Sequence, residues 1–164
     1  MIVILSPRLQ LSQFRMTDAQ EVFKCITPGI TRFMPWEPPS WSDYVTRCEK
    51  RVQSPEHTKF HFVIRRLDSG KCLGMASLED ADSVSPELGL WLEESAHGQG
   101  FGREVVASLT KWGHTSLGKE SFTYPVAVEN VASRRIAENL HGEIIGERTN
   151  PKYDSIVYRI PYCA

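Results

Sequence analysis

Short segments in which apolar and polar residues alternate recur along the chain, and this period of two is typical of β-strands with one buried face. The first segment begins with Leu9 and Leu11, and the turn Asp68-Ser69-Gly70 joins two later ones as a hairpin. A strand is predicted over each of these ranges: 9–14, 60–64, 72–78, 88–92, 122–128 and 156–160.

Other segments have the three- to four-residue apolar spacing of amphipathic helices. In the longest, four apolar residues recur at i, i+4, i+8 and i+11: Phe101, Val105, Leu109 and Trp112. This spacing predicts a helix that ends within 113–118. Shorter helices are predicted after the capping pair Thr17-Asp18, from about Ser42 to before Pro55, and over 130–140.

Residues 28–41 interrupt these patterns with four prolines, two tryptophans, Phe33 and Met34. Prolines oppose regular structure, whereas the aromatic rings carry a large apolar surface. We therefore expect an ordered loop, and two roles for it stay open: it covers a pocket, or its aromatic residues cover the core.

The order of these elements predicts an α+β fold. It contains a mostly antiparallel mixed sheet of about six or seven strands with helices on both faces, and one parallel crossover through the long helix. The sequence has no internal repeat and no linker, and 164 residues suffice for one hydrophobic core. A single domain over residues 1–164 follows.

Composition excludes several classes of protein. Lys and Arg number 19 against 20 for Asp and Glu, so no excess of positive charge favours nucleic acid or an anionic membrane. The apolar run over 2–5 is too short for a signal peptide or a membrane span, which makes the cytoplasm the default location. The four cysteines form no C-x-x-C pair and the histidines do not cluster, so no metal site is predicted.

A glycine-rich turn carries the clearest chemical signal. The segment His97-Gly98-Gln99-Gly100-Phe101-Gly102-Arg103 follows the strand that begins at Glu87 and opens the long helix. The unpaired N–H groups of a first helical turn attract anions, and glycines let a phosphate approach the backbone. The spacing matches neither the G-x-G-x-x-G dinucleotide motif nor the Walker loop. A tight turn without a ligand is the alternative interpretation.

Taken after that strand, Gly100-Phe101-Gly102 resembles the pyrophosphate loop of the GNAT acetyltransferase superfamily. A second motif, Asn130-Val-Ala-Ser133-Arg-Arg135 followed by Ala137-Glu138-Asn139-Leu140, is similar to the N-x-x-S-x-R helix of its RimJ/RimL-like branch. Further similarity to that branch is found in three places: Arg8-Leu9-Gln10-Leu11, Asp18-Ala19 with Phe23, and Met34-Pro35-Trp36. The resemblance thus spans nearly the whole chain.

The resemblance implies that acetyl-CoA binds as the acetyl donor across two splayed strands. The residues expected to bind it are Leu90, Trp91, Leu92, His97, Gly98, Gln99, Gly100, Phe101, Gly102 and Asn130. His97 stands where the superfamily usually has Gln or Arg, so a weaker or pH-dependent contact with the pyrophosphate is expected there.

Two residues are candidates for catalysis. Ser133 would donate a hydrogen bond or a proton to the departing thiolate, because Ala137 occupies the place of the tyrosine that many members use. Glu87 would be the general base, directly or through water. A structural role for Ser133 and a surface-charge role for Glu87 stay open. His57, His61 and His114 lie in no motif and are expected at solvated or core-edge positions.

The expected activity is acetyl transfer from acetyl-CoA to an amine, either a protein N-terminus or a small molecule. Two other classes stay open: a non-catalytic coenzyme A-binding regulatory domain, and a phosphate-binding module unrelated to acetyl transfer. No nucleic-acid or membrane partner is expected, and the sequence is compatible with a monomer or a homodimer.

Overall fold

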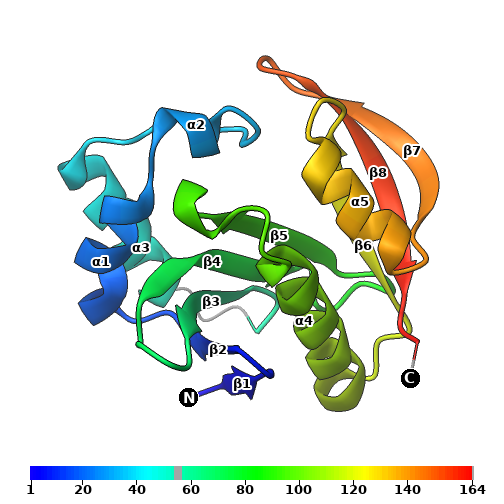
Figure 1. Cartoon of the computed structure of the whole chain (residues 1–164), viewed down its shortest axis with the longest axis horizontal. Helices are drawn as coiled ribbons and strands as arrows, with labels where there is room; N and C mark the ends of the chain where they lie inside the picture. Colours follow the sequence, from blue (N-terminus) through cyan, green and yellow to red (C-terminus); the bar gives the residue numbers. More distant parts are fainter. Residues whose placement is uncertain (54–56, 164) are drawn as a thin grey trace.

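One eight-stranded sheet runs through the computed structural model, which describes residues 1–53 and 57–163 (Figure 1). Its strands are β1 (Val3–Leu5), β2 (Leu9–Gln13), β3 (Phe60–Arg66), β4 (Cys72–Glu79), β5 (Glu87–Leu92), β6 (Ser121–Ala127), β7 (Glu143–Thr149) and β8 (Asp154–Pro161). The spatial order is β1-β2-β3-β4-β5-β6-β8-β7. All neighbours are antiparallel except β5 and β6.

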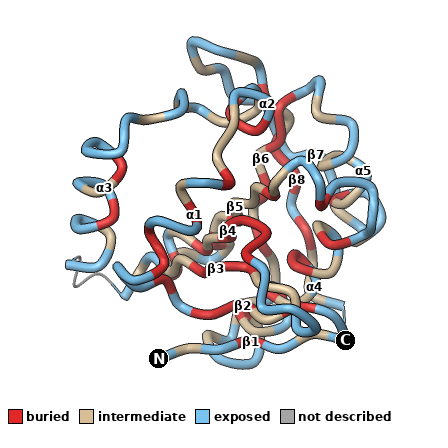
Figure 2. The backbone as a smooth tube through the Cα atoms, turned by 60° about the vertical axis from the view of Figure 1, so that its left-hand side comes forward, coloured by how far each residue is buried: buried red, intermediate tan, exposed pale blue. Residues whose placement is uncertain are grey.

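This sheet confirms the expected α+β class, and its eight strands exceed the six or seven predicted. The two edge strands, β1 and β7, lie outside the six ranges predicted from alternation, and the three residues of β1 are too short to show a period of two. β1 pairs with β2 from Val3↔Ser12 to Leu5↔Gln10. At the other edge, every residue of β7 is exposed (Figure 2), so burial does not impose an alternating pattern on that strand.

Five α-helices accompany the sheet within the described ranges: α1 (Ala19–Cys25), α2 (Pro28–Thr31), α3 (Trp41–Gln53), α4 (Phe101–Leu117) and α5 (Val131–Asn139). Short 3-10 helices cover Met16–Asp18 and Glu94–Ala96. α1 and α3 lie on one face of the sheet, and α4 and α5 on the other (Figure 1). Helices therefore cover both faces, as expected. Pro55, before which the second predicted helix was to end, lies outside the described residues.

The helix α2 corrects the expectation that residues 28–41 lack regular structure. Thr27 caps it, because its hydroxyl oxygen accepts a hydrogen bond from the Ile30 N–H at 3.4 Å. Pro28 occupies its first turn, where a proline loses no hydrogen bond. Only after this turn does the chain continue irregularly to α3.

Two apolar clusters hold the layers together. The larger lies between the sheet and α4, where Val105 and Leu109 are fully buried. Trp112 on the same helix contacts Phe60 and Phe62 edge to face, with ring centroids 5.1 and 5.4 Å apart. The smaller cluster joins α1 and α3 to β3 and β4 on the opposite face. The predicted stripe of the long helix is therefore its packing surface.

The parallel neighbours β5 and β6 separate almost at once. Their only register pair is Glu87↔Thr123, at the beginning of β5. Beyond this pair the backbone of β5 loses its partner on that side, while β4 stays paired along the whole strand. The opening between β5 and β6, with α4 and α5 beside it, determines where a ligand can enter the sheet.

Candidate functional site

The glycine-rich loop has the backbone conformation that its sequence requires. Gly98 and Gly100 have φ values of +73° and +78°, which side chains other than glycine rarely adopt. Gly100 is also the N-cap of α4, and no described side chain accepts a hydrogen bond from the first turn of this 17-residue helix. The N–H groups of this turn, at the positive end of the helix dipole, can therefore bind an anion.

Gly102 has a different role from the two preceding glycines. A Cβ atom at this position would lie 2.7 Å from Cδ1 of Ile136 and 3.5 Å from Cδ2 of Leu90. The glycine therefore lets α4 approach both α5 and β5 closely. Its spacing in the motif reflects packing between these elements, in addition to any contact with a phosphate.

Two side chains of the glycine-rich loop, those of His97 and Gln99, form contacts with backbone carbonyl oxygens close to the loop. Nε2 of His97 lies 2.8 Å from the carbonyl oxygen of Leu92, and Nε2 of Gln99 donates to the carbonyl oxygen of Ser95 at 2.8 Å. Both contacts hold the loop against the end of β5 and the 3-10 turn after it. Backbone N–H groups, rather than these two side chains, are the donors that the loop leaves available.

Arg8 supports the loop from below, a role that sequence reasoning missed. Its guanidinium donates to the carbonyl oxygen of Gln99 at 2.9 Å and forms an ion pair with Glu104 at 2.7 Å. The same group lies over the ring of Phe101, 4.4 Å from its centroid. The sequence signal was the Arg8-Leu9-Gln10-Leu11 motif, but residues more than 90 positions apart come together only in the fold.

A cavity of about 910 Å³ extends from this loop to α5. Nine of the ten predicted cofactor-binding residues line it, together with Ser133: Leu90, Trp91, Leu92, His97, Gly98, Gly100, Phe101, Gly102 and Asn130. Gln99 does not line it. We call this space the large cavity. Arg32, Arg103 and Arg135 also line it, together with Glu94 and Glu129, so its arginines outnumber its carboxylates by one.

The open edge of β5 presents the backbone of alternate residues. The Glu93 N–H donates to the Leu73 carbonyl oxygen, which directs this position toward β4. Since backbone groups alternate between the two edges of a strand, Leu90 and Leu92 face the opening between β5 and β6. The backbone of Trp91 faces β4, and its side chain packs against the smaller apolar cluster on the α1 and α3 face.

Ser133 and Asn130 lie at the start of α5 and line the large cavity. Asn130 is the N-cap, and its side-chain oxygen accepts a hydrogen bond from the Ser133 N–H at 3.3 Å. The Ser133 hydroxyl lies next to the phenol of Tyr124 on β6, which is 3% exposed. Burial raises the pKa of Tyr124 to about 12, against the opposing effect of the nearby Ser133 hydroxyl. Tyr124 is therefore a neutral phenol, and sequence reasoning did not identify it.

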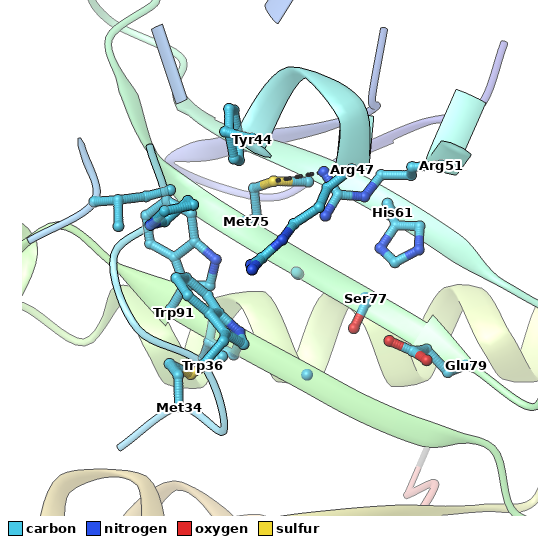
Figure 3. A pocket seen from close by; sticks show the side chains of 15 residues that line it. Met34, Trp36, Tyr44, Arg47, Arg51, His61, Met75, Ser77, Glu79 and Trp91 are labelled. Atoms are coloured by element: carbon cyan, nitrogen blue, oxygen red, sulfur yellow. Dashed lines mark hydrogen bonds between the residues drawn. The ribbon is translucent and has the colours of Figure 1, made fainter. Parts of the chain in front are cut away.

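A second cavity, of about 280 Å³, lies on the face of the sheet that carries α1 and α3 (Figure 3). We call it the small cavity. Its polar and charged lining residues are Tyr44, Arg47, Arg51, His61, Ser77 and Glu79, and Trp36 and Trp91 form its aromatic wall. Met34, Leu90 and Trp91 line both cavities, which therefore meet at the open edge of β5. Met34 and Trp36 confirm that part of residues 28–41 covers a pocket.

Glu87 begins β5 on the same sheet face as the small cavity, but it does not line that cavity. Its carboxylate accepts a hydrogen bond from Arg148 on β7 at 2.7 Å. Glu79 on β4 is its direct cross-strand neighbour and does line the cavity. The structure thus adds a second carboxylate to the candidate base, and the sequence motif had pointed only to the first.

Comparison of this chain with known protein families and solved structures agrees with this geometry. A family model described as an acetyltransferase (GNAT) domain matches residues 8–143, more than three quarters of the chain. The chain belongs to the GNAT acetyltransferase family. The resemblance seen in the sequence is therefore confirmed, with the glycine loop and the N-x-x-S-x-R helix of this GNAT domain meeting at one cavity.

Solved structures share this GNAT fold at low sequence identity. A GNAT-family acetyltransferase from Bacillus anthracis is 15% identical, with a TM-score of 0.85, and the match covers 98% of this chain and 99% of that one. RimL, a ribosomal L7/L12 α-N-protein acetyltransferase solved with coenzyme A, is 17% identical with a TM-score of 0.81 and coverages of 98% and 99%. A spermidine N-acetyltransferase from Vibrio cholerae, solved with CoA and spermine, is 17% identical with a TM-score of 0.82 and coverages of 96% and 97%.

The described residues contain neither a cluster of metal-ligating side chains nor a membrane-spanning helix. In residues 1–53 and 57–163, no group of three or more His, Cys, Asp and Glu side chains could hold a metal ion. No helix of these ranges combines the length and the apolar character that crossing a membrane requires.

Proposed function

We propose that this GNAT domain transfers the acetyl group of acetyl-CoA to an amine, which is either a protein N-terminus or a small molecule. The observation that carries the proposal is the meeting of two cavities at Leu90 and Trp91. A donor in the large cavity and an acceptor in the small one would reach the same point from different sides. RimL and the spermidine acetyltransferase, which share the fold, act on these two kinds of amine.

The large cavity fits acetyl-CoA in size and in the chemistry of its wall. Its volume of about 910 Å³ lies near the upper end of the range for ligand sites. The first turn of α4 would bind the pyrophosphate through backbone N–H groups, and Gly98 and Gly100 leave the space beside it free of side chains. The exposed edge of β5 at Leu90 and Leu92 would pair with the amides of the pantetheine arm as an added strand.

Acetyl transfer needs few proton movements. The nitrogen of the neutral amine attacks the thioester carbon, the carbon–sulfur bond breaks, and one proton leaves the nitrogen while the thiolate gains one. The N–H of Leu90 at the open edge of β5 would stabilise the negative charge that develops on the carbonyl oxygen. Ser133 would donate to the departing sulfur, and Tyr124, a neutral phenol beside it, would keep the hydroxyl oriented.

The base must suit the acceptor. Neutralising an α-amine with a pKa of about 7.7 costs roughly 1 kcal/mol at pH 7, whereas a lysine with a pKa of about 10.4 costs roughly 4.6 kcal/mol. A carboxylate that acts through water is sufficient for the α-amine. We keep Glu87 as the proposed base, and its cross-strand neighbour Glu79 is the alternative that the lining of the small cavity favours.

Two measurements test this proposal. Acetyl-CoA at 100 times its Kd should raise the free energy of unfolding by about 2.7 kcal/mol, and NAD and ATP should not, because the loop has neither nucleotide spacing. A panel of amines with acetyl-CoA should then release free thiol. Stabilisation without thiol release from any amine would favour the non-catalytic coenzyme A-binding domain. Stabilisation by ATP or NAD alone would contradict the donor assignment.

A further inference from the structure

The small cavity contains more positive than negative charge. Arg47 and Arg51 reach it from α3, and Glu79 is the only carboxylate among its lining residues. Figure 3 shows the two guanidinium groups over the strand that carries Met75, Ser77 and Glu79. A cavity that accepts amines would be expected to attract cations, so this arrangement needs an explanation.

The two arginines lack a carboxylate partner among the described residues. Neither belongs to the ion pairs of residues 1–53 and 57–163, whereas Arg65 on β3 binds both Asp18 and Glu21. Arg51 is held by softer contacts: its Nη1 atom lies 3.9 Å from both Sγ of Cys48 and Sδ of Met75. Its guanidinium is thus positioned but its charge is not neutralised by these contacts.

Tyr44 adds an unused donor to the same place. It is 5% exposed, lines the small cavity, and its hydroxyl has no hydrogen-bond partner among the described residues. Burial raises the pKa of Tyr44, so the group remains a phenol with a proton to donate. A buried hydroxyl without a partner is costly, and a ligand oxygen placed beside it would complete its hydrogen bonding.

His61 reports the same electrostatic environment from β3. Burial, together with the positive charges of Arg51 and Lys59, lowers the pKa of His61 to about 4. At neutral pH the imidazole is therefore uncharged and does not add a cation to the cavity. The groups around this end of the cavity disfavour one more positive charge, and they favour a negative one.

We propose that the acceptor is an amine that also carries a carboxylate, and that Arg47, Arg51 and Tyr44 bind this carboxylate. The inference rests on the proposed function, because it concerns the acceptor of the same reaction. The amine would point toward the meeting of the two cavities at Leu90, with Glu79 on the neighbouring strand. The wall formed by Trp36 and Trp91 would accept the apolar part of the molecule.

The size of the cavity limits the acceptor. A volume of about 280 Å³ lies just below the usual range for drug-sized ligands, which suits a single amino-acid-sized group. The carboxylate could come from two sources: the α-carboxylate of a free amino acid, or the acidic side chain of the first residues of a peptide. Polyamines, which have several positive charges and no carboxylate, should be poor acceptors.

Matched acceptor pairs test the inference. Leucine is compared with leucinamide, and an amidated tetrapeptide that begins with Asp is compared with the same peptide beginning with Asn; spermidine completes the set. In at least one pair, we expect the member that carries the carboxylate to have a kcat/KM at least tenfold higher than that of the member without it. Leucinamide has the more acidic ammonium group, so amine neutralisation alone would favour it over leucine.

Variants of α3 test whether Arg47 causes the preference for a carboxylate. Arg47→Gln should raise KM for the preferred acceptor at least tenfold and leave KM for acetyl-CoA unchanged. Lys50→Gln is the control, because it removes the same charge from an exposed position of α3 outside the small cavity. Arg47→Glu should reduce the difference within the pair and improve the use of spermidine.

A binding experiment keeps the inference testable without turnover. N-acetyl-leucine and N-acetyl-leucinamide are titrated against the tryptophan fluorescence of the full chain, since Trp36 and Trp91 line the small cavity. We expect tighter binding of the carboxylate, lost in Arg47→Gln. Equal use of both members of each pair, or a preference for spermidine, would overturn the inference and leave the acetyltransferase proposal intact. Failure of that proposal would instead show as absent thiol release and absent stabilisation by acetyl-CoA.

Discussion

The two cavities that meet at Leu90 are built in different ways. The large cavity is lined mainly by one continuous segment, from β5 through the glycine-rich loop into α4, and by α5, with residues of α2 and the loop after it completing the wall. The small cavity is formed by side chains from α3, β3, β4, β5 and the loop after α2. A donor that is the same in every member of a family suits a backbone site, whereas side chains can vary with the acceptor.

The largest expected effect is on the reacting groups where the two cavities meet. Ser133→Ala should lower kcat by about 10²-fold or more, the usual loss for a donor to developing negative charge, with unchanged acetyl-CoA affinity. Single-turnover kinetics and calorimetric titration measure the two quantities. Tyr124→Phe is the companion variant, and a smaller fall is expected because Ser133 retains its own hydroxyl. Full activity in Ser133→Ala would return this residue to a structural role.

The small cavity should respond to pH through His61. The unfolded chain takes up a proton below a pKa of about 6.5, and the folded chain only below about 4. The free energy of unfolding should therefore fall as the pH drops from 6.5 to 4, by on the order of 3 kcal/mol in total. Urea denaturation at several pH values tests this. His61→Gln should remove much of the slope, and the exposed His57→Gln should keep it. A slope that persists in His61→Gln would show that other groups cause it.

The large cavity should respond to its backbone. Gly100→Val places a branched side chain at a φ of +78°, which strains the loop and should raise the Kd of acetyl-CoA by about tenfold or more. Gly70→Val is the matched control, since Gly70 has a φ of +70° in the β3–β4 hairpin with no atom within 4 Å of a Cβ. Both variants should lose stability, and only Gly100→Val should lose affinity in calorimetric titration. Equal affinities would argue against a backbone site for the pyrophosphate.

The smallest effect is expected for the two carboxylates. If Glu87 is the base, Glu87→Gln should flatten the acid limb of the pH–rate profile, and high pH should partly restore the rate. Glu79→Gln should do so instead if the residue in the small cavity acts. Arg148→Gln separates a base from a charge partner, because it removes the ion pair of Glu87 and keeps the carboxylate. If Arg148→Gln and Glu87→Gln change the pH–rate profile equally, Glu87 acts as the ion-pair partner of Arg148 and not as the base.

Periodicity along the chain determined most of the fold. The stripe Phe101, Val105, Leu109 predicted α4, and alternation predicted six of the eight strands, because burial of one face repeats every two or every 3.6 residues. β1 was missed because a strand of three residues is too short to show an alternation of apolar and polar positions. The helix α2 was missed because the four prolines of residues 28–41 argue against regular structure, although Pro28 in the first turn is compatible with a helix.

The sequence by itself also located the large cavity, because Gly98, Gly100 and the start of α4 are adjacent in the chain and their conformation is a local property. Only the tertiary structure decided the small cavity. Arg47, His61 and Glu79 belong to three elements with unrelated local patterns, and strand pairing and the packing of α3 on the sheet bring them together. The same reason applies to Arg8, because its contact with Gln99 joins residues that are 91 positions apart, and to Tyr124, which comes to lie beside Ser133 where α5 follows β6.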